Sequence, residues 1–577
     1  MHDSRPLALI AFMGVLALAA CAPRGQEAPP SGSPGAGELA RQSAPKRIGA
    51  AIRGDPHTVY QKLNPRSNIP GIDDLERLVN AGLTVLDPDG VRQPILAEAV
   101  PSIENGLWRL FPDGSMETTW RIREGARWQD GTPLTTDDLV FTAQVWRDPE
   151  VPIFGHIAFA SVEDVSATDA RTITVRWKRP YIDADALFNT SGGNGFGLAI
   201  PKHLLARVYT EDKEHFLEHP YWSTDFVGTG PYRVREWQRG SHLVFEANER
   251  YLLGRPKIDE IRVKFIPDPN TLAANILAGE IDVTMGGRIS TEWAMNVRDQ
   301  WRDGQLVILN RSMIQVFSQF INPTPPIVGN LQFRRALLHA LDRQEMVDTL
   351  QFGLTSVGHT FVSPQEREYA AIEGSIVRYD YDPRRATQMI EVLGYGKGPD
   401  GIFRDRDGQR LQVQIRTSLG DDLQEKAMYA SADQWQRLGL DVERHLVPPQ
   451  RAADAEYRST FPAFDVKRQA GTMDYARNFH SDRVALPENS FLVSGNNSRY
   501  RNAELDAAID RYFTTIPFAE RMEAAREVVH YVSDQVAWIG LFYQTTPDLV
   551  ANRLLNVPVP RSSEGSRLWN VHEWDIK

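Results

Sequence analysis

Residues 119–146 read TWRIREGARWQDGTPLTTDDLVFTAQVW, and this stretch indicates the fold class. Trp120 lies where apolar and polar residues alternate, as they do on a half-buried strand. Asp130-Gly131 is typical of a tight turn. Thr135, followed three residues later by Asp138, has the pattern of a capping box at the start of a helix. The stretch therefore predicts a strand, a turn and then a helix.

Strand and helix signals alternate outward from this stretch. Residues 242–246 and 261–265 alternate apolar and polar side chains, which is the period of a strand. Asn330, Asp382 and Asn502 each precede an apolar pattern with helical spacing, where a side-chain cap is expected. The sequence therefore predicts a mixed α/β protein.

The N-terminus has the features of an export signal. Arg5 precedes an apolar segment at residues 7–18, and small residues follow it up to Cys21, the only cysteine of the 577 residues. The run LAAC that ends at Cys21 resembles the bacterial lipobox, whose cysteine is acylated; the alternative is a simple secretion signal with an incidental cysteine. We predict a lipoprotein signal peptide at 1–21 and, from its Pro, Gly and Ser content, a flexible tether at 22–45. The body would be lipid-anchored on the periplasmic or cell-surface side, and the sequence does not fix which membrane holds it.

Composition limits the class of partner. The chain has 75 acidic and 64 basic residues, with a net charge of -11, so it has no basic excess with which to neutralise phosphates. Nucleic acid is therefore not expected as a partner. The length exceeds what one hydrophobic core usually supports, so two or three lobes are expected.

Several fragments of the chain resemble those of the family 5 extracellular solute-binding proteins, the peptide- and nickel-binding components of ABC importers. They occur in the family's order and extend from about residue 47 to the end of the chain. The fragments are PILAE at 94–98, WQDGTP at 128–133, IPKH at 200–203, GTGPY at 228–232, NERY at 248–251, AGEID at 278–282, FRRAL at 333–337, YDP at 381–383 and YRNAELD at 500–506.

The resemblance implies an α/β, periplasmic-binding-protein-like clamp with three lobes and a hinge. The ligand would lie in a cleft between lobes I and III, and the lobes would close around it. The expected division is lobe I at 46–80, 223–310 and 545–577, lobe II at 81–222, and lobe III at 311–544.

The same resemblance implies a transport function rather than an enzymatic one. The expected solute is a peptide or a peptide-like molecule, and the expected partner is an ABC permease in the cytoplasmic membrane. We expect a monomer that needs no cofactor or metal and has no catalytic residue.

The candidate ligand site lies at Gly471, Thr472, Met473, Asp474 and Arg477. In peptide-binding relatives the matching segment pairs with the peptide backbone, and an aspartate that corresponds to Asp474 pairs with the peptide's ammonium group. Ala476-Arg477 stands where an Asp-Pro pair is usual in those relatives, and Arg477 could bind a ligand carboxylate. A loop cap or a surface ion pair is the structural alternative for Asp474.

Two other functions fit part of the sequence. HFLEH at 215–219 matches the H-x-x-E-H zinc-peptidase pattern, with His215 and His219 as metal ligands and Glu218 as the base. Pro220, directly after the second histidine, would end the helix that this pattern needs. The second alternative is a clamp that holds peptides as a sensor, without a permease.

Overall fold

The computed structural model describes residues 44–64, 69–190, 195–286, 289–451, 454–492 and 495–577. The predicted signal peptide, the lipidation site Cys21 and nearly all of the predicted tether lie outside the described residues. Among the described residues, no helix is both long and apolar enough to cross a membrane.

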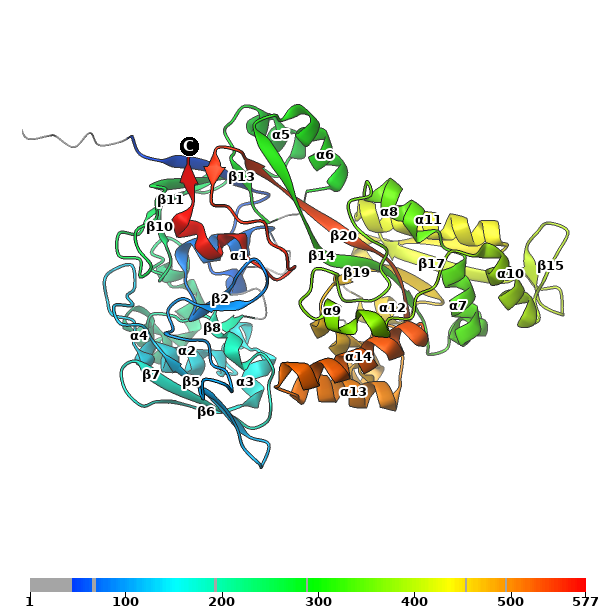
Figure 1. Cartoon of the computed structure of the whole chain (residues 1–577), viewed down its shortest axis with the longest axis horizontal. Coiled ribbons are helices and arrows are strands. Elements are labelled where there is room, and N and C mark those ends of the chain that lie inside the picture. The colour runs from blue at the N-terminus through cyan, green and yellow to red at the C-terminus, as the bar shows by residue number, and fades with distance from the viewer. Residues whose placement is uncertain (1–43, 65–68, 191–194, 287–288, 452–453, 493–494) are drawn as a thin grey trace, which may run out of the picture. The chain divides into compact units, whose positions relative to one another are not determined.

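A ten-stranded mixed sheet is the main element of residues 45–577 (Figure 1). Its strand order is β10-β11-β12-β1-β13-β20-β14-β19-β17-β18. The alternating segments predicted as strands fall on β11 and β12. The bounds are β1 Arg47–Ile52, β10 Tyr232–Gln238, β11 His242–Ala247, β12 Glu260–Phe265, β13 Val283–Thr284, β14 Gly304–Ser318, β17 Gln412–Ser418, β18 Asp441–Val447, β19 Phe464–Ala470 and β20 Trp538–Ala551.

The long strands β14 and β20 run side by side through the middle of this sheet (Figure 1). They pair antiparallel from Gly304 opposite Ala551 to Phe317 opposite Trp538. The register shifts twice, between Asn310 and Ser312 and again between Ile314 and Gln315. The pair joins β1 and β10–β13, in the ranges predicted as lobe I, with β17–β19 in the range predicted as lobe III.

A second sheet of four antiparallel strands, ordered β4-β5-β7-β6, lies within the range predicted as lobe II. Trp120, on β5, is fully buried, as the alternation in the sequence predicts. The remaining strands form two-stranded pairs. The bounds are β4 Trp108–Leu110, β5 Met116–Arg121, β6 Val162–Ala167, β7 Thr172–Trp177, β2 Thr84–Leu86, β3 Arg92–Pro94, β8 Leu187–Asn189, β9 Phe196–Gly197, β15 Gly396–Lys397, β16 Phe403–Arg404, β21 Leu554–Leu555 and β22 Asp575–Ile576.

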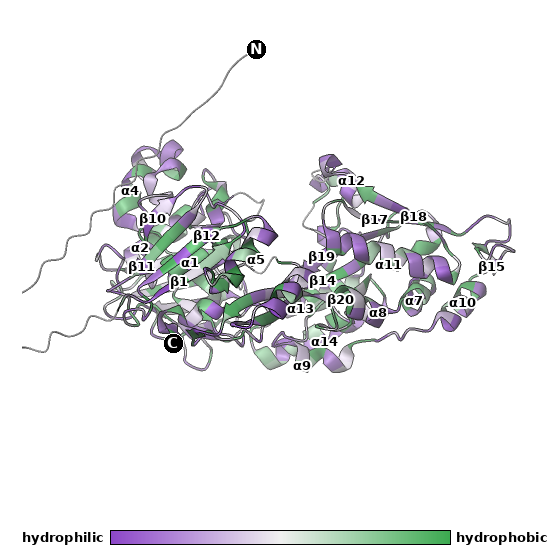
Figure 2. Ribbon diagram, turned by 90° about the horizontal axis from the view of Figure 1, so that it is seen from above, coloured by the Kyte–Doolittle hydropathy of each residue, from purple (hydrophilic) through white to green (hydrophobic). Residues whose placement is uncertain are grey.

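Four of the helices begin where the sequence predicts caps. Thr135 and Asp138 form the capping box of α2, and the side chains of Asn330, Asp382 and Asn502 accept backbone N–H bonds at the starts of α7, α10 and α13. Figure 2 shows both hydrophilic and hydrophobic residues along helices such as α10 and α11, as expected of helices that bury one side. The bounds are α1 Ile72–Val79, α2 Thr136–Trp146, α3 Ile157–Ser161, α4 Lys202–Glu211, α5 Pro269–Leu277, α6 Thr291–Gln300, α7 Leu331–His339, α8 Arg343–Leu350, α9 Tyr369–Ile372, α10 Pro383–Val392, α11 Asp422–Leu438, α12 Ala455–Ser459, α13 Ala503–Thr514 and α14 Phe518–Asp534.

Gln129, from the stretch that indicates the fold, joins three segments through its buried amide. Its Nε2 donates to the carbonyl oxygens of Val79 at 3.1 Å and Tyr232 at 2.6 Å, and its Oε1 accepts from Gly228 N–H at 3.0 Å. A Cβ atom at Gly228 would lie 2.0 Å from the Val79 oxygen, and one at Gly230 would lie 2.4 Å from Asn80 N. The GTGPY segment therefore needs its glycines because it packs directly against the end of α1.

Two ion pairs connect residues 561–567 of the C-terminal segment to the rest of the protein. Arg567 forms an ion pair with Asp548 on β20, and both side chains are almost fully buried. Arg561 forms an exposed ion pair with Asp89 in the turn between β2 and β3. These two contacts fix residues 561–567 against the body of the protein.

Candidate functional site

The predicted ligand segment directly follows β19. Gly471 and Thr472 continue the extended chain, and the 3-10 helix η9, Met473–Phe479, begins one residue later. The carbonyl oxygen of Gly471 already accepts a bond of 2.8 Å from Ser363 N–H. The part of the segment that could pair with an extended ligand is therefore short.

The 3-10 geometry of η9 decides which side chains can reach a ligand. Residues three apart lie on the same side of such a helix, so Asp474 and Arg477 share one face and Met473 and Phe479 share another. Both of these apolar side chains are buried. Met473 can therefore contribute to a site through its backbone only, whereas Asp474 and Arg477, both half-buried, present charged groups.

Asp474 lies among other carboxyl groups. Burial raises the pKa of Glu366 to about 7, with further contributions from the charges of Glu368 and Asp474. Burial, followed by the charges of Asp474 and Glu366, raises the pKa of Glu564 well above its usual range. The pKa of Asp183 is raised by burial and then by the charge of Asp474. We call Asp183, Glu366, Glu368, Asp474 and Glu564 the acidic cluster.

The members of the acidic cluster come from distant parts of the chain. Asp183 follows β7, where the ring of Tyr181 stacks on that of Trp177 with the centroids 5.5 Å apart. Glu366 and Glu368 precede α9, and Glu564 belongs to the C-terminal segment. Sequence reasoning found Asp474 and missed the other four carboxyl groups. Nothing in their local sequence marks them, because only the tertiary fold brings them together.

Arg477 is the cation of the predicted segment. Its guanidinium carbon lies 3.4 Å from the centroid of the Phe513 ring, a cation–π contact that orients the side chain. Its charge counteracts the rise in the pKa of Asp183 and contributes, after burial and the charge of Lys62, to lowering the pKa of His156 to about 4. The charge of Arg477 therefore acts both on the acidic cluster and on His156 at the start of α3.

The charges of two other arginines, Arg92 and Arg521, lower pKa values within the acidic cluster. Arg92 lies 3.3 Å from Asp185, and the charge of Arg92 also lowers the pKa of Asp183. The charge of Arg521 acts on Glu368 in the same direction. Burial nevertheless dominates at both carboxyl groups, so the net effect is a rise in pKa. The arrangement is suited to holding a positively charged group.

Glu366 also makes a direct contact with the C-terminal segment. Its Oε1 accepts a hydrogen bond of 3.2 Å from the backbone N–H of Ser563 and a second bond from the Ser563 hydroxyl. Both residues are buried. The contact joins residues that are 197 positions apart.

The H-x-x-E-H segment does not form the helix that the zinc pattern requires. His215 lies on the short 3-10 helix η4, Lys213–Glu218, whereas His219 lies beyond its end with an extended ψ of 136°. The Nδ1 atom of His215 lies 2.8 Å from Asp212, and Nδ1 of His219 accepts from Tyr221 N–H. Within the described ranges, no group of three or more His, Cys, Asp or Glu is placed to hold a metal ion.

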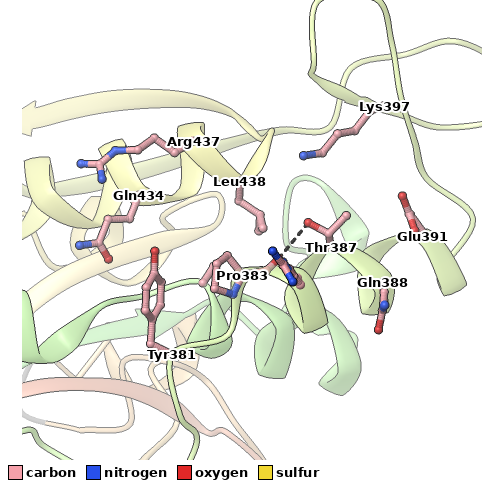
Figure 3. A pocket seen from close by; sticks show the side chains of 11 residues that line it. Tyr381, Pro383, Thr387, Gln388, Glu391, Lys397, Gln434, Arg437 and Leu438 are labelled. Carbon is pink, nitrogen blue, oxygen red and sulfur yellow. Dashed lines mark hydrogen bonds between the residues drawn. The ribbon is translucent and has the colours of Figure 1, made fainter.

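A surface cavity of about 610 Å³ lies between α10 and α11 (Figure 3). Lys397 reaches toward it from β15, and Leu438 contributes an apolar wall. Thr387, which also lines it, donates its hydroxyl to the carbonyl oxygen of Pro383 at 2.9 Å. None of the predicted ligand residues lines this cavity.

The chain is similar to several characterised binding proteins. It is 23% identical over 559 residues to the oligopeptide-binding protein AppA of Bacillus subtilis, covering 94% of this chain and 95% of that protein. It is 23% identical over 467 residues to heme-binding protein A of Haemophilus influenzae, covering 78% of each.

Solved structures confirm the predicted α/β fold class. The B. subtilis AppA structure in complex with a nonapeptide matches with a TM-score of 0.66 and 21% identity, over 92% of this chain and all of that one. NikZ from Campylobacter jejuni in complex with Ni(L-His) matches with a TM-score of 0.68 and 20% identity, over the same shares. The family model for bacterial extracellular solute-binding proteins, family 5 (middle region), matches residues 98–497. As its sequence fragments predict, the chain belongs to the family 5 bacterial extracellular solute-binding proteins.

Proposed function

We propose that this chain captures a positively charged peptide or peptide-like solute at Asp474 and delivers it to an ABC permease. Its relatives are substrate-binding proteins of ABC transporters and not enzymes. The observation that carries the proposal is the acidic cluster around Asp474. Buried carboxylates that raise one another's pKa values are stabilised by a cation placed among them. A ligand ammonium or guanidinium group would supply that cation.

Each predicted residue has a distinct role in this proposal. The backbone N–H and C=O groups of residues 471–473 would bind the ligand backbone. The Gly471 carbonyl oxygen is the exception, because it already accepts from Ser363 N–H. Asp474 would pair with the ligand cation. Arg477, held on the Phe513 ring, would bind a carboxylate at another point of the ligand. A zwitterionic solute satisfies both charges.

Delivery requires a change of conformation. We propose that the lobes close on the solute and that the closed form docks on the permease; the solute must then bind the closed form more tightly than the open one. In this proposal lobes I and III, with the ranges predicted above, are joined by the shared strands β14 and β20. The lipid on Cys21 would keep the protein at the membrane.

Mass spectrometry of the solute that co-purifies with the full chain tests this proposal. The chain is extracted in mild detergent, purified without denaturation and then released from its ligand in acid. We expect a compound with at least one amine or guanidine group. A co-purified compound with acidic groups only would contradict the charge class.

The affinity for a cationic probe is expected to rise with pH. Trilysine should pair with ionised carboxylates, so binding must release the protons that Glu366, with its pKa raised to about 7, and its neighbours hold at lower pH. Affinity should increase between pH 5 and pH 8, by up to about tenfold per pH unit for each proton released. Calorimetry in two buffers of different ionisation enthalpy measures that proton count.

The variant Asp183→Asn is the control for this pH dependence. It keeps the shape of the side chain but removes one titrating group, so the slope of affinity against pH should fall. An affinity for trilysine that stays constant from pH 5 to pH 8, or no binding at any pH, would contradict the role of the acidic cluster. Without a solute, the contribution of Glu366 to folding has the opposite sign. Between about pH 4.5 and 7 the folded state holds the Glu366 proton more firmly than the unfolded state does, so this contribution to stability falls as pH rises through the window.

Replacing Cys21 with serine is expected to abolish lipid labelling. The thiol is the group that is acylated, so the variant should appear in the soluble fraction while it keeps its affinity for trilysine. Metabolic labelling with a palmitate analogue, followed by membrane fractionation, measures both effects. Equal membrane retention of the variant and the wild type would rule out Cys21 as the anchor.

A further inference from the structure

Glu366 belongs to a segment that is attached to the long strands β14 and β20 and to the start of the ligand segment. The Tyr543 hydroxyl on β20 donates to the carbonyl oxygen of Val362 at 2.7 Å. Gln365 Oε1 accepts from Asn310 N–H on β14 at 2.8 Å. Together with the Ser363 bond to Gly471, these contacts place Glu366 on the side of the protein that carries Asp474.

Ser563 belongs to the segment 561–563, which is attached to the turn between β2 and β3. The backbone N–H groups of Arg561 and Ser562 donate to the carbonyl oxygen of Pro88 at 2.7 and 3.1 Å. The side chains of Arg561 and Asp89 form an ion pair that attaches the segment to the same turn. Ser563 is therefore held next to the β2–β3 turn, in the range predicted as lobe II, and the ion pair of Arg567 attaches the same C-terminal segment to Asp548 on β20.

The contact between Glu366 and Ser563 consists of two hydrogen bonds to one buried carboxylate oxygen. A carboxylate that accepts two hydrogen bonds binds its donors more tightly than a neutral acceptor does. Glu366 is 7% exposed and Ser563 is 9% exposed. A buried Ser563 N–H that loses its acceptor without gaining water is costly, so the contact favours the arrangement in which both bonds are made.

We propose that Glu366 and Ser563 form a latch that closes beside the ligand site and stabilises the closed clamp. The proposal rests on the hinge closure proposed above. Opening would separate the β2–β3 turn from the segment next to Asp474, and both bonds to Glu366 would break. The latch would therefore slow the release of a bound solute.

Hydrogen exchange at the Ser563 amide tests the latch, because that N–H is one of its donors. In the full chain without solute, Glu366→Ala should speed exchange at Ser563 by about tenfold, which corresponds to 1.4 kcal/mol. Glu366→Gln keeps an acceptor oxygen and should retain slow exchange. Ser562→Ala is the matched control, because it removes a neighbouring buried hydroxyl that does not bond to Glu366 and should leave exchange at Ser563 unchanged.

Small-angle scattering on the same variants separates a latch from a local contact. The radius of gyration should be larger for Glu366→Ala than for the wild type and the same for Glu366→Gln. Exchange at Ser563 that is unprotected in the wild type, both without solute and with trilysine, would overturn the latch, as would equal exchange in Glu366→Ala and the wild type. Faster exchange with an unchanged radius of gyration would also overturn it. Trilysine that fails to bind would contradict the proposed function instead, and the comparison without solute would still decide the latch.

Discussion

Replacing Asp548 with alanine is expected to lower the free energy of unfolding by about 3–5 kcal/mol, the range measured when one partner of a buried ion pair is removed. Asp548 pairs with Arg567, and the side chains are only 3% and 4% exposed. The Thr284 hydroxyl also donates to the Asp548 carboxylate at 3.2 Å. Without the carboxylate, the Arg567 guanidinium remains buried with no charge to balance it. Urea unfolding followed by circular dichroism measures the change.

The exposed ion pair of the same C-terminal segment supplies the control. Asp89→Ala removes the partner of Arg561 at a position open to water, where such pairs contribute little to stability. We expect its unfolding curve to stay close to that of the wild type. Equal destabilisation by Asp89→Ala and Asp548→Ala would show that burial does not determine the contribution of these pairs.

Replacing Asp474 with asparagine is expected to weaken the binding of trilysine by about 2–5 kcal/mol, a typical cost of truncating one partner of a buried charge pair. The variant keeps the size of the side chain but removes the charge that faces the ligand cation. Removing that charge should also lower the pKa values of Glu366 and Glu564, which the charge of Asp474 raises. Calorimetric titration of both proteins at pH 8 measures the affinity difference.

Asp482→Asn is the matched control for this experiment. Asp482 lies eight residues further along the chain, and its side chain is 71% exposed and bonded to His480. The affinity of the Asp482→Asn variant for trilysine should equal that of the wild type. Near-equal affinities for Asp474→Asn and the wild type would remove Asp474 from the site, whereas a large loss of unliganded stability would assign it a structural role.

The elements that the sequence predicts well depend on near neighbours. Asp382 bonds to Arg385 N–H three residues away, and Asn502 bonds to the N–H groups two and three residues ahead. Such contacts are decided by the chain within one helical turn. Capping residues and strand alternation therefore indicate the element starts and the α/β class before any tertiary contact is known.

The candidate site depends on residues that are far apart in the sequence. The family resemblance locates Asp474, but Asp183 and Glu564 come to it from 291 residues before and 90 residues after. Neither carboxyl group has a neighbour in sequence that distinguishes it from a surface acid. Burial gives these groups their raised pKa values, and burial is a property of the folded chain rather than of a local pattern.

Local patterns can also mislead when one residue overrides them. HFLEH at 215–219 has the spacing of two ligands on one helical turn, yet His219 has left the helix by the point where Pro220 begins the next short helix. Proline lacks the N–H group that would continue the preceding helix. The spacing of two histidines therefore predicts a shared face only if the backbone between them is helical.

The paired strands β14 and β20 restrict the kind of motion available to the clamp. Their hydrogen-bond ladder fixes the register on both sides of the two bulges at Asn310 and Ile314, so neither strand can slide along the other without breaking many bonds at once. Bulges locally increase bending and twist while the flanking pairing is kept. In the proposed closure we therefore expect bending at the bulges rather than sliding of one strand along the other, which would be a single reaction coordinate. One pair of distance labels placed on either side of the bulges would then report the whole transition.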